Sequence, residues 1–579
     1  MAYTEIEKLK SSTFNNEDDL LQSDSSSSPD VPSNASGSTQ TPLSLPTDTQ
    51  LTYLSFAQHT STVVPLAQYW YCRGIPLLSE RGKRWIYSKT DEDITSGRFQ
   101  FFNCQSSPLP LARPLLSSHR ELNWQQFFFF KSSFHLAFPV LDNIHFEETI
   151  KNAYECTTSM PSPPQALSMA CVLAALSIFC RLEGSRAILP SADGDTYADK
   201  AQSLLGYVTG ETSLVGLQTV LLLQRHQMSN GQGQNVTLLH AVACRIVCAL
   251  GGHTYQPLVP YGDKISWEER QRHHLRMLFG LCYISDKDIS LRSGQPPLLT
   301  KDYCDLTIPE SCTSYCAHIL EFGEATTYNK LHFHILGDPS LCCLKEKIYR
   351  LLFSPQAFRI SDGDLVLRIR QLDDDLESWR LSIPWEFRPK LSISSAQVVL
   401  ATEANFPQDV MSVHLQLEYH HLVTAIHTTL RRCGGDSPEH RDLPGDLHNV
   451  IHSSCDLSLE ANRSTLTVLE SCIGVLAEEE FSATVFYPTL AVVSLFIDIL
   501  AHPRGAQAHV AIEDLLSAIN IIQNLLISTP TEAELKQIQE TTSFVRALIH
   551  LGRSDIAKAK REDTQIDNVS SNVSCLGLQ

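Results

Sequence analysis

Apolar residues recur at steps of three and four along much of the chain, which is the pattern of amphipathic helices. The clearest case is 364–380, where a single apolar stripe comprises Leu365, Ile369, Leu372, Leu376 and Trp379. The segment 510–526 repeats this pattern, and we expect further helices at 413–432, 457–478 and 486–500. No sustained alternation of apolar and polar residues indicates a sheet. The sequence therefore predicts an all-α fold built as a large multi-helical domain.

Changes in composition divide the chain into four parts. Residues 1–50 are rich in Ser, Pro and Thr and cannot repay the entropy of ordering, so we expect a disordered N-terminal arm. Residues 51–122 are interpreted as an irregular linker, and 123–553 as the helical domain. Polar residues dominate 554–579, for which we predict a disordered tail.

The charge of the chain bears on nucleic-acid binding. The chain carries 64 acidic and 45 basic residues, which gives a formal net charge of −19. Phosphate binding depends largely on Lys and Arg, so the surface as a whole repels nucleic acid. A DNA contact would need a local basic module, and the sequence contains none. We therefore assign no DNA-binding residues.

The cysteines and the apolar runs indicate the cellular compartment in which the chain folds. Seventeen cysteines show no repeated spacing, and several, such as Cys171 and Cys244, lie in apolar helical stretches. This distribution favours buried thiols in a reducing compartment over a disulfide framework. The longest apolar run, 485–500, contains Pro488 and Asp498 and falls short of the roughly 18 residues of a membrane span.

The longest motif in the chain begins at Trp267 and reads WEERQRHHLRMLFGLCYISDKDISLRSGQPPLLTKDYCDLTIPE. A basic helix with R-x-R and L-F is followed by an aspartate, a G-x-P turn, a pair of aspartates and a proline. This order resembles the middle homology region of fungal zinc-cluster transcription factors, although Gly280 stands where the family usually has Trp. The corresponding positions are Arg270, Arg272, Leu278, Phe279, Asp286, Gly294, Pro296, Asp302, Asp305 and Pro309.

Three shorter stretches extend the resemblance. LHAVACRIVCALGGH at 239–253 is similar to a family helix that ends in glycine. QFFFFKSSFHLAFPVLD at 126–142 resembles the family's aromatic entry helix, and LLSERGKRWIYSKTDED at 77–93 resembles a segment that precedes the region in a subset of these factors. The resemblance thus spans roughly residues 70–550.

The motif residues have a structural interpretation. Arg270 or Arg272 facing Asp286 or Asp302 would form an internal ion pair that fixes the loop between helices. The G-x-P segment most simply forms a turn. We treat the motif positions as structural, and we assign no catalytic residue and no metal ligand.

The resemblance implies a transcriptional regulator that acts in the nucleus on RNA polymerase II genes, with a metabolic or biosynthetic gene set as one candidate target. The family's DNA-binding module holds two zinc ions with six thiolates in a pattern built on C-x-x-C pairs. This chain has no C-x-x-C, so zinc and direct DNA contact are not assigned to its residues. Expected partners are other transcription regulators and no membrane, with a small-molecule effector and a homo- or heterodimer left open.

The sequence leaves two alternatives to a regulator open. Asp373, Asp374 and Glu377 match the D-D-x-x-E metal motif of terpenoid synthases, but the apolar stripe of the same helix directs Asp374 and Asp375 towards solvent. No second metal-binding segment, phosphate loop or nucleophile elbow is found, so we do not expect an enzyme. A non-catalytic helical adaptor is the other alternative, although no repeat period supports a stacked scaffold.

Overall fold

The computed structural model describes residues 67–94, 140–154, 162–180, 194–206, 212–260, 262, 265–307, 338–385, 387–393, 406–433, 445–476, 484–525 and 532–576. Three predictions lie outside these residues, namely the arm at 1–50, nearly all of the aromatic stretch 126–142, and the role of Pro309.

The described part of the chain is built from helices, which confirms the all-α prediction. Its one sheet is a hairpin in which β1 (Tyr71–Cys72) pairs antiparallel with β2 (Ile75–Pro76). No described helix has the length and apolar character needed to cross a membrane. The helices are η1 (Ala67–Tyr69), α3 (Glu80–Thr90), α6 (Asn143–Tyr154), α7 (Pro163–Phe179), α9 (Gly194–Ser203), α11 (Leu214–Ser229), α12 (Gly233–Ala249), α13 (Trp267–Ser293), α16 (Pro339–Ile348), η3 (Tyr349–Phe353), η4 (Pro355–Phe358), α17 (Asp362–Ser382), α18 (Phe406–His427), η6 (Thr428–Arg432), α19 (Gly445–Ser471), α20 (Ile473–Leu476), α22 (Phe486–Ala501), α23 (Gln507–Asn524) and α24 (Glu532–Leu576).

The five helices expected from apolar periodicity are present as α17, α18 with η6, α19 with α20, α22 and α23. Most ends lie within a few residues of the prediction, but α18 begins at 406 rather than 413 and α19 at 445 rather than 457. In α17 the whole predicted stripe is buried, because its five residues lie on one face of the helix. The apolar period was thus sufficient to place these helices.

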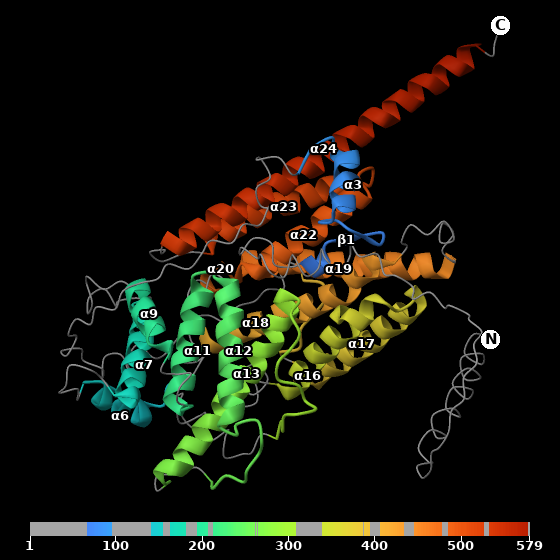
Figure 1. Ribbon diagram of the computed structural model, residues 1–579. Coiled ribbons are helices and arrows are strands. Elements are labelled where there is room, and N and C mark those ends of the chain that lie inside the picture. The colour runs from blue at the N-terminus through green and yellow to red at the C-terminus, as the bar shows by residue number, and fades with distance from the viewer. Residues whose placement is uncertain are drawn as a thin grey trace, which may run out of the picture. The chain divides into compact units, whose positions relative to one another are not determined.

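The buried apolar side chains form two clusters, which we call the first core and the second core. The first core is built by α6, α7, α9, α11, α12 and the middle of α13. The second core is built by the hairpin, α3 and the helices from α16 to α24. In Figure 1 the first group runs from cyan to green, and most of the second from yellow to red.

Helix α13 contributes to both cores. Residues from Met277 to Tyr283 lie in the first core, whereas Leu291, two turns further along, lies in the second. The helix packs against α12 on one side and α16 on the other. The longest motif of the sequence therefore lies where the two cores meet.

The segment 67–94 differs from the irregular linker predicted for it. Trp70, Leu77 and Ile86 are almost completely buried and belong to the second core. Sequence composition missed this because the hairpin and α3 are short, and their burial depends on helices that follow more than 300 residues later in the chain.

The S-E-R-G stretch of this segment begins helix α3. The Ser79 hydroxyl accepts a hydrogen bond from the Gly82 N–H at 3.0 Å, which caps the helix start. A Cβ at Gly82 would lie 2.2 Å from the carbonyl oxygen of Pro76, so only glycine allows this approach of helix to hairpin.

The C-terminal helix also runs further than the sequence indicated. Helix α24 continues past Arg553, where a disordered tail was predicted to begin, and ends at Leu576. Ile556 and Ala559 are buried, and Lys558 forms an ion pair with Asp91 of the N-terminal segment at 2.6 Å. The polar composition after Arg553 thus reflects a helix with one narrow packed face.

Candidate functional site along helix α13

Helix α13 has defined ends. The Ser266 hydroxyl accepts a hydrogen bond from the Glu269 N–H at 3.2 Å and caps the start. At the other end Gly294 adopts a φ of 73° and donates its N–H to the Ser290 carbonyl at 2.9 Å. This left-handed conformation favours glycine and stops the helix at the G-x-P segment.

The first turn of α13 is fixed by a buried ion pair between Arg270 and Asp142. The shortest contact joins Arg270 Nη2 to Asp142 Oδ2 at 2.6 Å, and Nε donates to both carboxylate oxygens. Burial alone would raise the pKa of Asp142, but the hydrogen bonds from Arg270 and from the His145 N–H outweigh it and lower the pKa to about 2. Asp142 also caps α6 through the N–H of Ile144.

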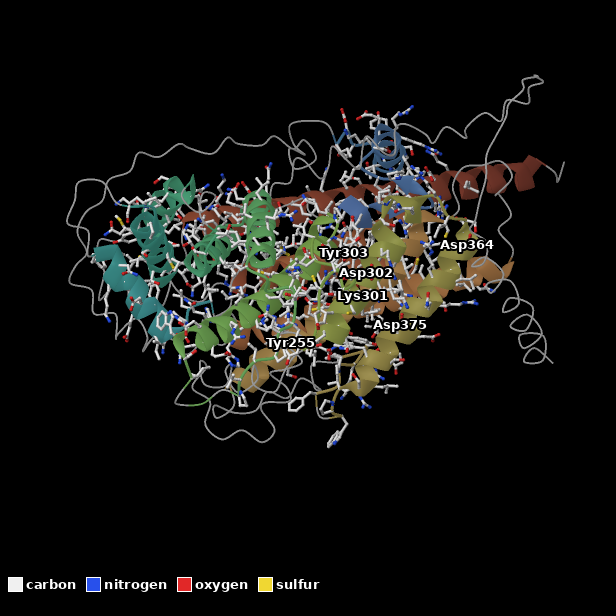
Figure 2. The ribbon with its side chains drawn as sticks, turned by 60° about the horizontal axis from the view of Figure 1, so that its bottom comes forward. Tyr255, Lys301, Asp302, Tyr303, Asp364 and Asp375 are labelled. Atoms are coloured by element: carbon white, nitrogen blue, oxygen red, sulfur yellow. The ribbon has the colours of Figure 1, made fainter. Side chains whose placement is uncertain are left out.

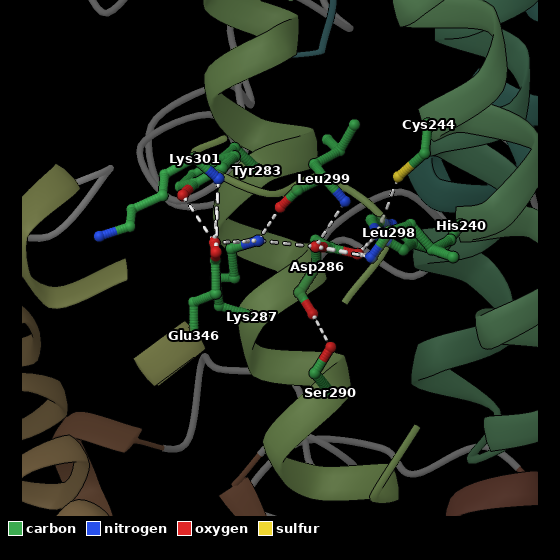
Figure 3. A network of polar contacts seen from close by, with 10 residues as sticks. All are labelled: His240, Cys244, Tyr283, Asp286, Lys287, Ser290, Leu298, Leu299, Lys301 and Glu346. Carbon is green, nitrogen blue, oxygen red and sulfur yellow. Dashed lines mark hydrogen bonds and ion pairs between the residues drawn. The ribbon is translucent and has the colours of Figure 1, made fainter. Parts of the chain in front are cut away.

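The middle of α13 carries a second buried carboxylate, Asp286. Its oxygens accept hydrogen bonds from the backbone N–H groups of Leu298 and Leu299 at 2.9–3.1 Å, which fixes the loop after the helix (Figure 3). Burial alone would raise the pKa of Asp286, but the hydrogen bond from His240 and the charge of Lys287 lower it below its usual value.

Lys287 connects Asp286 to helix α16. Its side chain has no solvent exposure, and Nζ lies 2.9 Å from Asp286 Oδ2 and 3.2 Å from Glu346 Oε2. Nζ also donates to the Leu299 carbonyl and lies 4.2 Å from the ring centre of Tyr283. The ammonium is thus surrounded by acceptors, and this is the condition under which a charge can be buried at low cost.

Glu346 completes this network from α16. It accepts a hydrogen bond from the Tyr283 hydroxyl at 3.1 Å and weaker ones from the Lys301 N–H at 3.3 and 3.4 Å. Figure 3 shows these groups converging from α13, α16 and the loop that follows α13. The network thus connects α13, α16 and the loop after α13 around the buried ammonium group of Lys287.

His240 and Cys244 approach the other side of Asp286 from helix α12. His240 Nε2 lies 3.2 Å from Asp286 Oδ1 and 3.1 Å from Cys244 Sγ. In a nucleophilic triad the imidazole would use one nitrogen for the thiol and the other for the carboxylate, whereas here Nε2 contacts both. Burial also raises the pKa of Cys244 strongly, so the thiol is not activated as a nucleophile.

The end of α13 enters a third charged cluster in the second core. Arg292 Nη2 lies 3.6 Å from Glu418 Oε1 and donates to the Tyr487 hydroxyl at 3.1 Å. Glu418 also pairs with Lys345 at 2.6 Å, and Lys345 pairs with Asp288 of α13. Burial alone would raise the pKa of Glu418, but Lys345 and the other neighbouring cations hold it well below its usual range.

The structure does not bring the predicted ion-pair partners together. Arg270 pairs with Asp142 rather than with Asp286 or Asp302, and the exposed Arg272 pairs with Glu269 one turn earlier. The prediction was wrong in its partners because Arg270 faces the start of α6, a contact that spacing within the motif cannot show. Asp142 comes from a segment 128 residues away in the chain.

Leu278 and Phe279 lie within α13 and are buried in the first core, and the other motif positions follow the helix. Pro296 follows Gly294 in the loop, and Asp302 is an exposed residue between Lys301 and Tyr303 (Figure 2). Asp305 is also at the surface, where its side chain accepts from the Thr307 N–H at 2.9 Å. Hydrogen bonds from the Thr307 side chain and backbone lower the pKa of Asp305.

Several residues of the charged clusters were missed from the sequence. Asp142 had a usable signal, because an aspartate directly before a helix is a common N-cap. Lys287 also had one, since a lysine within an apolar helix requires a buried partner. Glu346, Lys345 and Glu418 carry no local signal, because their partners lie on helices far away in the chain.

The acidic motif on α17 does not form a metal site in the structure. Asp373 lies 3.3 Å from His427 Nε2, Asp375 pairs with Lys347, and Glu377 pairs with Arg380 of the same helix. Asp374 is exposed, and Figure 2 shows Asp375 on the same helix as Asp364. The carboxylates face solvent and neighbouring cations, so the terpenoid-synthase alternative is not supported.

Comparison with known proteins found one matching family. Residues 124–380 match the family described as fungal specific transcription factor domain, a range that contains the first core, α13 and α16 and ends within α17. This part of the chain is thus similar to a domain of fungal transcription factors.

Two curated relatives are similar over most of the chain. An ABC-transporter-regulating transcription factor of Aspergillus oryzae is 24% identical over 79% of this chain and 48% of its own length. A protein of the same description from Aspergillus fumigatus is 23% identical over 84% of this chain and 54% of its own length. The chain thus spans about half the length of these relatives. No solved structure matches it.

Proposed function

We propose that the chain acts in the nucleus as the regulatory region of a zinc-cluster type transcription factor for RNA polymerase II genes, and that it catalyses no reaction. The observation that carries the proposal is the fungal specific transcription factor domain at 124–380. The charged clusters along α13 agree with this role, because their buried groups pair with one another and leave no activated nucleophile.

We further propose that the target genes include genes for ABC transporters. Both relatives are named for the regulation of such transporters, and each matches about four fifths of this chain. The sequence resemblance implies a metabolic gene set as one candidate target. Genes for ABC transporters are a more specific form of that target.

The net charge of −19 argues against DNA binding by the helical body itself. DNA contact is therefore proposed to come from a partner regulator or from a zinc-cluster module outside this chain. The helical body would then supply contacts to other regulators, to a second copy or to an effector.

The test has two arms. In the first, the chain is fused to a heterologous DNA-binding domain and placed upstream of a reporter gene, and we expect reporter expression to change in either direction. In the second, the gene is deleted in its own fungus, and transcripts of ABC transporter genes are measured against the parent strain.

The exposed Asp302→Asn variant is the control, and we expect it to behave as the unaltered chain in the reporter fusion and when it is returned to the deletion strain. A silent fusion together with unchanged transporter transcripts would overturn the proposal. Reporter activity with unchanged transporter transcripts would retain the regulator and reject the target class.

A further inference from the structure

Three ligand atoms converge beside the network of Figure 3. His240 Nε2, Cys244 Sγ and a carboxylate oxygen of Asp286 all lie within 4.8 Å of one another, and all three residues are buried. His240 and Cys244 stand one turn apart on α12, so both side chains face α13. No other such group of three or more His, Cys, Asp or Glu occurs among the described residues.

Hydrogen bonds alone do not satisfy all the polar atoms of these three side chains. His240 Nε2 faces both Cys244 Sγ and Asp286 Oδ1, although one ring nitrogen makes only one strong hydrogen bond. His240 Nδ1 is buried and has no hydrogen-bond partner among the described residues. The residue is only 1% exposed, so bulk water does not surround its ring.

The spacing suits a tetrahedral metal ion. Ligand atoms around zinc, with Zn–N and Zn–O near 2.1 Å and Zn–S near 2.3 Å, lie about 3.3–3.6 Å apart. The observed 3.2 Å and 3.1 Å separations need to open by only a few tenths of an ångström. Asp286 is already oriented, because Leu298, Leu299 and Lys287 hold its oxygens as outer partners hold a metal-binding carboxylate.

We propose that His240 Nε2, Cys244 Sγ and Asp286 Oδ1 bind one zinc ion, with water in the fourth position. Binding forms a bond from each of these atoms to the ion and releases the Cys244 thiol proton to solvent. The described residues supply three protein ligands, which is the number found in zinc sites that keep one position open.

The charge of the surroundings fits this proposal. Asp286, Glu346 and Lys287 together carry one net negative charge when Cys244 is a neutral thiol. Zinc brings two positive charges and converts the thiol to a thiolate, so the buried set becomes neutral. The nearby Lys287 is therefore compatible with the ion, since three anionic groups balance three positive charges.

This ion is separate from the zinc of the family's DNA-binding module, which six thiolates hold in a C-x-x-C pattern that this chain does not contain. The proposal also stands apart from the proposed function, since a zinc site in the helical body is independent of which genes are regulated.

The test uses the full chain and two probes, zinc and cobalt. Zinc is measured by mass spectrometry after dialysis into metal-free buffer, and Co²⁺ is added to the metal-free protein to detect thiolate-to-cobalt absorption in the near ultraviolet. We expect about one zinc per chain and a cobalt band, as for a structurally supported site.

The variant Cys244→Ser should remove the cobalt band and weaken zinc binding by about 100-fold or more. Even substitution of a residue that only hydrogen-bonds to a metal ligand lowers metal affinity by roughly 10- to 100-fold. Cys248→Ser is the matched control, because Cys248 lies on the next turn of the same helix and is half-buried. We expect it to keep the band and the zinc.

Circular dichroism and thermal unfolding establish that each variant folds. If Cys244→Ser does not fold, the cobalt band of the wild type still decides whether a thiolate binds metal. Absence of both zinc and band, or equal binding by wild type and folded Cys244→Ser, would overturn the proposal and leave a network of hydrogen bonds and ion pairs alone.

Discussion

The two cores of this protein differ in how they bury charge. Beside the first core Arg270 forms a bidentate pair with Asp142, and these side chains are 10% and 0% exposed. In the second core Glu418 is shared by Lys345 and Arg292, whose side chains are 4% and 21% exposed. A bidentate pair matches one cation to one anion, whereas loss of a shared carboxylate leaves two cations short of negative charge.

The two cores also differ in how far the matched domain covers them. The matched range 124–380 contains all helices of the first core, whereas α18 to α24 of the second core follow it. Helix α13 carries the motif and places charged groups in both cores through Arg270 and Arg292. The motif helix therefore contributes to the charge pairing of both cores.

The largest effect is expected from Glu418→Ala in the second core. Removal of this carboxylate leaves the buried Lys345 with Asp288 alone and the half-buried Arg292 without its carboxylate, so we expect the free energy of unfolding to fall by about 3 kcal/mol. Chemical denaturation measures the change. The control Glu377→Ala breaks an exposed pair with Arg380 and should cost less than about 0.5 kcal/mol. Similar losses in both variants would show that the shared carboxylate Glu418 contributes no more to the free energy of unfolding than an exposed one.

The next effect concerns the N-terminal segment, which we place within the second core. In Gly82→Ala the new Cβ would meet the Pro76 carbonyl oxygen at 2.2 Å, so helix and hairpin must separate. We expect a loss of about 3 kcal/mol in thermal or chemical unfolding. A loss of a few tenths of a kcal/mol would show that 67–94 packs loosely, as a linker would.

Acid should weaken both cores through buried histidines. Burial lowers the pKa of His274 in the first core and of His420 in the second to about 4, from a usual 6.5. The folded state holds each of these histidines neutral. Each therefore contributes stability that is fully present above pH 6.5 and is lost as the pH falls towards 4. We expect a loss of about 2 kcal/mol per histidine at pH 5.

Chemical denaturation of His274→Gln and His420→Gln at pH 7 and at pH 5 measures this effect. Each variant should lose less stability between the two pH values than the wild type. If only one variant shows the reduced dependence, acid acts on one core alone.

The smallest effect has the opposite sign. Gly280 lies in the middle of α13, and a Cβ there would meet nothing within 4 Å among the described residues. Glycine costs a helix interior about 0.5–1 kcal/mol relative to alanine, so Gly280→Ala should raise the free energy of unfolding by that amount. A destabilised variant would indicate that this position contacts another part of the chain.

The sequence predicted the helices better than the contacts between them. Periodicity placed α17 and α22 because each buries one continuous apolar stripe or run. The same reasoning gave Arg270 the wrong partner, since Asp142 becomes its neighbour only when α6 packs against the start of α13. It also missed Glu418, whose partners are brought together by three helices of the second core.

Native-state hydrogen exchange on the wild type and on Asp286→Asn would show most clearly whether α13 joins the two cores into one cooperative body. The substitution weakens the network around Lys287 without removing any apolar side chain. We predict that exchange in α11 and α12 of the first core and in α17 and α18 of the second rises by a similar factor, because the two cores open together. Faster exchange confined to α13, or to one core alone, would contradict this account.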